Sequence, residues 1–248
     1  MKLECVLTAV NENKLYMDFI DIFIKSWNKL YPYVDVKIIL ISNKIPDEYT
    51  KYSKNIILFE PIENISTAFI SQYIRLLYPC ILNYNSIMIT DIDNIPMNSE
   101  FFSKNIEDIP NDKWVNLRDW VYNNQISMAW QIASSNTWRE VFGISNLDEI
   151  KERLIEVNKS IKYQNKHGGR GWSKDQLDLY KYVMNWKNKE NNYVVLKDSN
   201  TKFKRLNRGG FNKEELLKSN IKGKYSDYHC LRPMSMYKDI NYKILELI

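Results

Sequence analysis

The 248-residue chain has few of the residues that interrupt or cross-link a fold: 7 Gly, 7 Pro and 3 Cys. So little glycine and proline excludes a low-complexity or linker-rich protein. Cys5, Cys80 and Cys230 are too scattered for a disulfide framework or a Cys-x-x-Cys motif, so a reducing interior is expected. No apolar run approaches the roughly 18 residues of a membrane span.

The amino-terminal residues 1–14 lack the features of a targeting segment. Their apolar stretch becomes polar at Asn11 without a small-residue cleavage site, so we expect a first strand here and no signal peptide. With no spanning segment, this predicts a cytoplasmic protein. The formal net charge of +5 suits an anionic ligand such as a nucleotide but selects no particular partner.

Hydrophobic residues make up 44% of the chain, which is enough for one substantial core. In the first half their spacing predicts strands over 3–10, 35–42, 55–61 and 86–93, with helices over 14–32 and 65–82. Strands that alternate with helices predict an α/β fold, with a mainly parallel central sheet and helices on both faces.

The second half is less regular. Its spacing predicts strands over 113–121, 126–135 and 193–198, and helices over 136–143, 147–163 and 174–186. A regular half joined to an irregular half is typical of a nucleotide-binding part followed by an acceptor-binding part.

Two aspartates follow the fourth predicted strand, in the sequence SIMITDIDNIPM of residues 86–97. Asp91-x-Asp93 can be an ordinary turn, because aspartate and asparagine stabilise turns. If the strand continued through the motif, both carboxylates would point to one face, at the strand end where α/β proteins bind ligands. Two hard oxygen ligands there suit Mg²⁺ or Mn²⁺. The motif alone leaves turn and metal site open.

Other residues could meet this aspartate pair. Arg75 is either a surface arginine or a guanidinium for an anionic leaving group. Asp175 follows a Gly-rich loop, residues 165–173. Its carboxylate either interacts favourably with the dipole of the helix that begins there or acts in catalysis. His229 is either structural or a third ligand for Mn²⁺. His167 is a weaker candidate that could contact an acceptor instead.

Residues 71–97, SQYIRLLYPCILNYNSIMITDIDNIPM, resemble a signature of GT-A glycosyltransferases, especially the glycogenin-like and lipopolysaccharide-galactosyltransferase-like family. In that family a Tyr-x-Arg-Leu-Leu-x-Pro helix precedes a strand that ends in Asp-x-Asp. The matching residues, in order, are Tyr73, Arg75, Leu76, Leu77, Pro79, Asp91 and Asp93.

Two further stretches are similar to motifs of the same family. Asp175-Gln176 is similar to its Asp-Gln pair on the acceptor side, and HCLRP, residues 229–233, to its C-terminal histidine motif. Arg232 and Pro233 stand where the family has glycine and lysine. The family's Asn-Ala-Gly stretch is not evident in residues 126–135.

The resemblance implies a GT-A (Rossmann-like) fold in a single domain, 1–248, with a nucleotide-sugar-binding half, 1–98, and an acceptor-binding half, 99–248. It implies a metal-dependent glycosyltransferase that moves a sugar from a UDP- or GDP-sugar to a hydroxyl of a glycan, protein or lipid. The metal, Mn²⁺ or Mg²⁺, would offset charge on the leaving nucleotide diphosphate.

The resemblance also suggests roles for individual residues. The expected metal ligands are Asp91, Asp93 and His229, and Arg75 would add positive charge. The expected nucleoside contacts, which agree with the strand-end rule, are Thr8, Ala9, Asn11 and Tyr16. Asp175 would be the base for the acceptor hydroxyl in an inverting enzyme. In a retaining enzyme Asp175 and Gln176 would line the reacting face.

Three alternatives remain. A sugar nucleotidyltransferase should have a Gly-rich phosphate loop after the first strand, but TAVNENKLY, residues 8–16, has no glycine. A haloacid dehalogenase-type phosphatase would have its aspartates after the first strand. A nucleic-acid-binding module is suggested by residues 202–213, which interleave basic and aromatic side chains. A solvated, mobile loop explains that run better, and nucleic acid is not an expected partner.

Overall fold

The computed structural model describes residues 1–166, 168–212, 214, 216 and 220–248. Its central element is a seven-stranded sheet with the strand order β10–β6–β9–β4–β1–β2–β3. The strands are β1 (Cys5–Asn11), β2 (Asp35–Ile41), β3 (Ile56–Phe59), β4 (Ile87–Ile89), β6 (Trp114–Asn116), β9 (Gln131–Ala133) and β10 (Tyr193–Val195). Neighbours are parallel except at β9, which is antiparallel to β4 and β6. The prediction of a mainly parallel sheet is confirmed.

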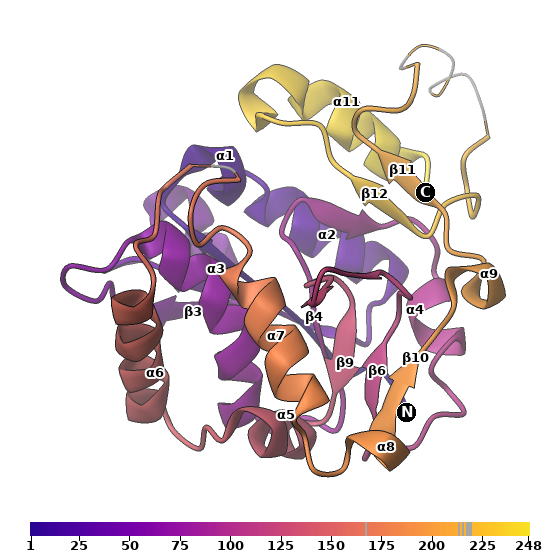
Figure 1. The fold of residues 1–248 in the computed structure, drawn as a ribbon. Helices are drawn as coiled ribbons and strands as arrows, with labels where there is room; N and C mark the ends of the chain where they lie inside the picture. Colours follow the sequence, from indigo (N-terminus) through magenta and orange to yellow (C-terminus); the bar gives the residue numbers. More distant parts are fainter. Residues whose placement is uncertain (167, 213, 215, 217–219) are drawn as a thin grey trace.

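Helices cover both faces of this sheet, as predicted (Figure 1). The long ones are α2 (Ile20–Leu30), α3 (Thr67–Leu77), α5 (Ser135–Phe142), α6 (Leu147–Ser160), α7 (Lys174–Met184) and α11 (Met234–Glu246). The short ones are α1 (Lys14–Met17), α4 (Phe101–Lys104), α8 (Lys189–Asn192), α9 (Asp198–Thr201) and the 3₁₀ turns η1 (Asp47–Tyr52) and η2 (Tyr78–Ile81). None of the helices in the described part of the chain combines the length and apolarity needed to cross a membrane.

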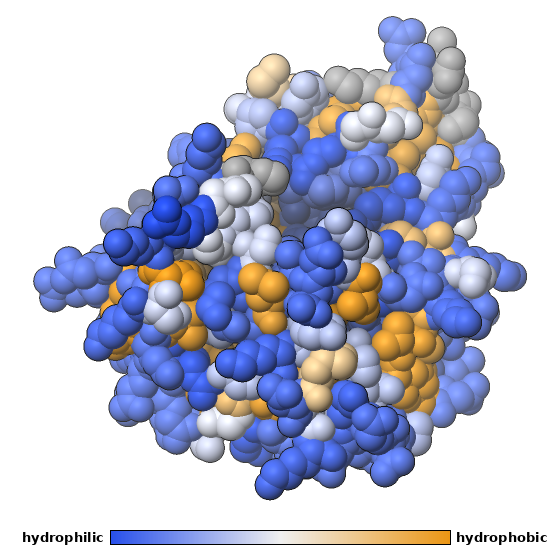
Figure 2. Space-filling view, in the orientation of Figure 1, coloured by the Kyte–Doolittle hydropathy of each residue, from blue (hydrophilic) through white to orange (hydrophobic). Residues whose placement is uncertain are grey.

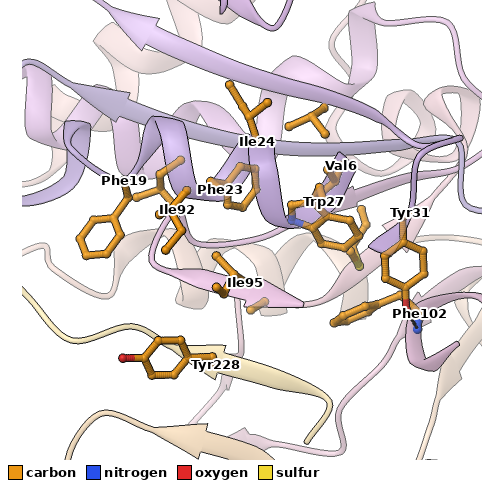
Figure 3. Close-up of a cluster of buried hydrophobic side chains, with 14 of the residues drawn as sticks. Val6, Phe19, Phe23, Ile24, Trp27, Tyr31, Ile92, Ile95, Phe102 and Tyr228 are labelled. Atoms are coloured by element: carbon orange, nitrogen blue, oxygen red, sulfur yellow. Dashed lines mark hydrogen bonds between the residues drawn. The ribbon is translucent and has the colours of Figure 1, made fainter. Parts of the chain in front are cut away.

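Alternation along β1 divides the core between the two faces of the sheet. Val6 points to the face covered by α2, where it joins Phe23 and Trp27 (Figure 3). Leu7 points to the opposite face and joins Ile74 of α3. Because successive strand side chains point to opposite faces, a strand buried on both sides must be apolar throughout. β1 therefore runs through the centre of the molecule, and only its carboxyl end can reach a ligand.

A second, smaller sheet lies beside the carboxyl-terminal end of the chain (Figure 1). It consists of β5 (Asn94–Pro96), β12 (Asp227–His229) and β11 (Arg205–Asn207), with β12 in the middle. β12 is antiparallel to β5 and parallel to β11. This sheet was not predicted, because strands of three residues are too short for their alternation to be visible. A separate hairpin joins β7 (Val121–Tyr122) to β8 (Gln125–Ile126).

Candidate active site

A cavity of about 280 Å³ lies beyond the carboxyl ends of β1 and β4. Figure 2 shows a hollow, bordered mainly by hydrophilic residues, on the side of the molecule where α7 and the small sheet approach each other. The predicted site residues that line the cavity are Ala9, Asn11, Tyr16, Arg75, Asp91, Asp93, Asp175, Gln176 and His229. Residues from five separate stretches of the sequence therefore meet at one place.

Among the predicted site residues within the described part of the chain, Thr8 is the one that does not line the cavity. It is fully buried and its hydroxyl has no hydrogen-bond partner. Strand alternation directs Thr8 to the same face as Val6, whereas Ala9 and Asn11 point to the α3 side. Asn11 Nδ2 donates to Thr67 Oγ1 at the start of α3, at 3.1 Å. The end of β1 thus offers Ala9 and Asn11, but not Thr8, to a ligand.

The two aspartates of the Asp-x-Asp motif do not share one strand face, so this part of the prediction is wrong. β4 ends at Ile89, and the chain turns over residues 91–93, where Asn94 N–H donates to the Asp91 carbonyl at 3.1 Å. Ile92 between the aspartates is buried in the α2 core (Figure 3). Burial of this isoleucine anchors the turn, and the flanking carboxylates contact different partners.

Asp91 belongs to a cluster that we call the helical wall, formed by Arg75, Asp91 and Asp175. The Arg75 guanidinium is buried and contacts the Asp91 carboxylate. It also donates to the Thr90 carbonyl at 3.1 Å and to Asp175 Oδ2 at 3.4 Å. The surface interpretation of Arg75 is therefore wrong. One buried arginine is shared by two carboxylates.

Asp175 lies in the first turn of α7, as its sequence position predicts, and only 5% of it is exposed. Its Oδ1 accepts a hydrogen bond from the Gln176 backbone N–H at 2.8 Å, and its Oδ2 faces Arg75. Burial raises the pKa of Asp175 from 3.8 to about 7, although Arg75 acts in the opposite direction. A carboxyl group with this pKa can accept or hold a proton near neutral pH.

Asp93 belongs to a second cluster, the strand wall, formed by Asp93, Arg208, His229 and Arg232. Arg208 Nη1 donates to Asp93 Oδ2 at 3.1 Å, and Arg208 Nη2 contacts His229 Nε2. His229 Nε2 lies 3.5 Å and Arg232 Nη1 lies 3.7 Å from the same carboxylate oxygen. One buried carboxylate here faces two guanidinium groups and an imidazole.

The strand wall has the opposite effect on its carboxylate. Burial by itself raises the pKa of Asp93, but the hydrogen bond and charge of His229, with Arg208 and Arg232, outweigh it and lower this pKa from 3.8 to about 2. Arg232 also donates to the Tyr16 hydroxyl at 2.8 Å, so it links the strand wall to the chain after β1. The net positive charge of this wall suits an anionic ligand.

The donors predicted for a metal ion are of the right chemical type. Asp91 and Asp93 supply carboxylate oxygens, and His229 Nδ1 lies 3.0 Å from Asn207 Oδ1. A carbonyl oxygen on one imidazole nitrogen leaves the other, Nε2, with the lone pair that a metal ion requires. Within the described residues, however, no three histidine, cysteine, aspartate or glutamate side chains form a ready metal cluster. Each aspartate instead faces an arginine.

Sequence reasoning missed the role of two arginines. The basic run 202–213 was interpreted as a solvated loop, but residues 205–207 form β11, and Arg205 pairs with the buried Asp227. Arg208 comes from the same run, and Arg232 was noted only as a departure from the family pattern.

Tyr163 was also missed. It lines the cavity, as Trp172 does, and its hydroxyl donates to Gln72 at 2.7 Å.

His167 and Lys213 lie outside the described residues. Nothing in the structure therefore bears on the expectation that His167 contacts an acceptor. The signal that could have found Arg208 was the density of basic residues in 202–213, but that density does not show which of them faces Asp93 and His229.

Comparison with solved structures gives the fold. The galactosyltransferase LgtC, in a complex with donor and acceptor sugar analogues, aligns with 98% of this chain and 94% of its own, with a TM-score of 0.51 and 13% identity. The glycosyltransferase GlyE of Streptococcus pneumoniae TIGR4 aligns with 99% of this chain and 63% of its own, with a TM-score of 0.50 and 15% identity. No family model and no curated protein matches the chain. The predicted GT-A fold is confirmed.

Proposed function

We propose that this chain is a glycosyltransferase that takes its sugar from a nucleotide-diphosphate donor. The observation that supports this most directly is the cavity: of the predicted site residues that the structure describes, all except Thr8 line it. It lies at the carboxyl ends of parallel strands, where open α/β sheets bind nucleotides. The fold is also that of LgtC and GlyE, two glycosyltransferases.

The donor would bind between the end of β1 and the strand wall. The nucleoside would contact Ala9, Asn11 and Tyr16. The diphosphate would face Arg208 and Arg232, because guanidinium groups form paired, charge-assisted hydrogen bonds with phosphate oxygens. We include both UDP- and GDP-sugars in this proposal, since none of these contacts selects a base.

Asp91, Asp93 and His229 would hold a divalent cation, Mn²⁺ or Mg²⁺. When bound, such an ion offsets the charge that develops on the leaving nucleotide diphosphate. The carboxylate oxygens suit both ions, and the imidazole favours Mn²⁺. Asn207 would fix the orientation of the His229 ring through Nδ1.

The helical wall would serve the reacting sugar and the acceptor hydroxyl. In an inverting reaction Asp175 accepts the proton of the attacking hydroxyl, a role that its raised pKa favours. In a retaining reaction Asp175 and Gln176 line the reacting face instead. The aromatic rings of Tyr163 and Trp172, which also line the cavity, would pack against sugar rings of the acceptor, a glycan or a glycan-bearing protein or lipid.

The rival functions have weaker structural support. The residues between β1 and α1, Glu12 and Asn13, contain no glycine for the phosphate loop of a nucleotidyltransferase. Two arginines of the basic run, Arg205 and Arg208, face Asp227 and Asp93 and are not presented to a nucleic acid.

A thermal-shift screen tests the proposal. UDP and GDP with Mn²⁺ should each be compared with Mn²⁺ alone, and a ligand at 100 times its Kd should stabilise the folded protein by about 2.7 kcal/mol. The nucleotide that binds is then offered as a set of sugar conjugates, and released nucleotide diphosphate is measured. No stabilisation by any nucleotide diphosphate, together with no turnover of any sugar nucleotide, would refute the proposed function.

A further inference from the structure

Arg208 occupies the space between two of the proposed metal ligands. Its Nη1 is 3.1 Å from Asp93 Oδ2, and its Nη2 contacts His229 Nε2. The side chain is 23% exposed, and the Asp93 side chain is 6% exposed, so the ion pair is largely shielded from water. The contact with His229 Nε2 uses the one lone pair through which this ring could bind a divalent cation, and the contact with Asp93 uses one of its two carboxylate oxygens.

The small sheet explains why this arginine reaches the site. His229 is in register with Asn94 of β5 on one side and with Asn207 of β11 on the other. Asp93 immediately precedes β5 and Arg208 immediately follows β11, so both lie at the same end of the sheet, on either side of His229. The Cys230 N–H donates to the Asp93 carbonyl at 2.8 Å and fixes this end. The position of Arg208 is therefore set by backbone pairing.

A guanidinium group and a divalent cation cannot both occupy His229 Nε2, because this nitrogen has a single lone pair, and the two positive charges repel each other beside Asp93. Arginine carries five N–H donors, has no acceptor and stays charged at all relevant pH values, so it can only compete for the lone pairs of Asp93 and His229. We propose that Arg208 is an internal cation that holds the metal position at Asp93 and His229, and that a divalent ion must displace it. This inference rests on the proposed metal ligands of the glycosyltransferase site.

Metal binding without nucleotide tests the competition directly. The metal-free protein is titrated with Mn²⁺, and free Mn²⁺ is followed by its electron paramagnetic resonance signal. Arg208→Gln should bind Mn²⁺ at least about tenfold more tightly than the parent, because nothing then has to leave Asp93. Arg208→Lys, which keeps a positive charge, should retain an affinity close to that of the parent.

Lys204→Gln is the matched control, because it removes one charge from the exposed start of the same basic segment outside the cavity. Its Mn²⁺ affinity should equal that of the parent. If Arg208→Gln has a reduced melting temperature, Arg208→Met provides a second neutral variant with a long side chain. A folded neutral variant that binds Mn²⁺ no more tightly than Lys204→Gln, or not at all, would overturn the inference. This readout needs no turnover, so failure of the parent to process sugar nucleotides would refute the proposed function separately.

Discussion

The two walls of the cavity treat a buried carboxylate in opposite ways. Burial raises the pKa of both Asp175 and Asp93, yet the pKa of Asp175 lies at about 7 and that of Asp93 at about 2. In the helical wall Asp175 shares the single cation Arg75 with Asp91. In the strand wall Asp93 alone faces two arginines and a histidine. Because both carboxyl groups are buried, the difference in the direction of their pKa shifts comes from the number of cations that face each of them.

This difference divides the chemistry of a glycosyl transfer between the walls. The helical wall has an excess of carboxylate, so it can take up a proton. The strand wall has an excess of cation, so it can hold an anionic diphosphate. The following changes alter one wall at a time.

The largest effect is expected from Asp175→Asn in the helical wall. If Asp175 is the base, turnover should fall by about 10²–10⁴-fold while donor binding persists, because general-base catalysis contributes that much. The effect on turnover is measured as kcat, and the effect on donor binding is measured separately as the Kd of the nucleotide. Asp178→Asn, one turn further along α7 and bonded to Tyr73 outside the cavity, should lose stability and keep its turnover. Near-normal turnover of Asp175→Asn would exclude a catalytic role for Asp175. A product with retained anomeric configuration would instead favour a retaining reaction, in which Asp175 and Gln176 line the reacting face.

The next largest effect is expected when each wall loses its aspartate of the Asp-x-Asp motif. Asp91→Asn and Asp93→Asn should each reduce turnover by about 10²–10³-fold, since a bound metal contributes several kcal/mol and 1.36 kcal/mol is a factor of ten. Both should also lose Mn²⁺-dependent binding of UDP or GDP, measured by calorimetry. The exposed Asp108→Asn serves as the control. Parental Mn²⁺-dependent binding by either variant would exclude the metal site.

A smaller effect concerns stability and pH. The pKa of Asp175 is raised in the folded state, so the folded protein binds more protons than the unfolded chain between pH 4 and 7. The stability that protonated Asp175 contributes is therefore lost as the pH rises through this window. Between pH 5 and 7 the parent should lose about 2 kcal/mol of unfolding free energy relative to Asp175→Asn, at about 1.4 kcal/mol per unit over most of the interval. Urea unfolding at several pH values measures it. Parallel curves for parent and variant would contradict the raised pKa.

The sequence predicted the helical wall better than the strand wall, for a physical reason. β1, β2, α2 and α3 have 7 to 11 residues each, long enough for their apolar period to be visible. Arg75 lies on α3, only 16 positions before Asp91, so local structure brings them together. The Asp175 candidate followed from its position at a helix start after a flexible loop.

The strand wall depends on pairing between distant segments. Asp93 and Arg208 are 115 positions apart, and strands of three residues bring them together. Neither their length nor their composition indicates that they pair. His229 was found because histidine is rare in this chain and has the right chemistry, whereas Arg208 is one of 35 basic residues. The end of β4 was misjudged because the burial of Ile92 in the α2 core is a tertiary effect.

The smallest effects are expected from His229→Ala in the strand wall and from Asn207→Ala beside it. The His229→Ala variant loses one neutral donor but keeps both carboxylates, so Mn²⁺-dependent nucleotide binding should weaken by about tenfold, or about 1.4 kcal/mol, which is less than in the aspartate variants. Asn207→Ala should have a still weaker effect, because it removes only the oxygen that orients the imidazole through Nδ1. A calorimetric titration of UDP in excess Mn²⁺ measures both. A crystal structure with Mn²⁺ and the nucleotide diphosphate provides the sharper test, since a nitrogen that binds a divalent ion directly lies roughly 2 Å from it. An imidazole well beyond that distance, with unchanged affinity in His229→Ala, would leave the metal to the two aspartates and limit the histidine to its contacts with Arg208, Asp93 and Asn207.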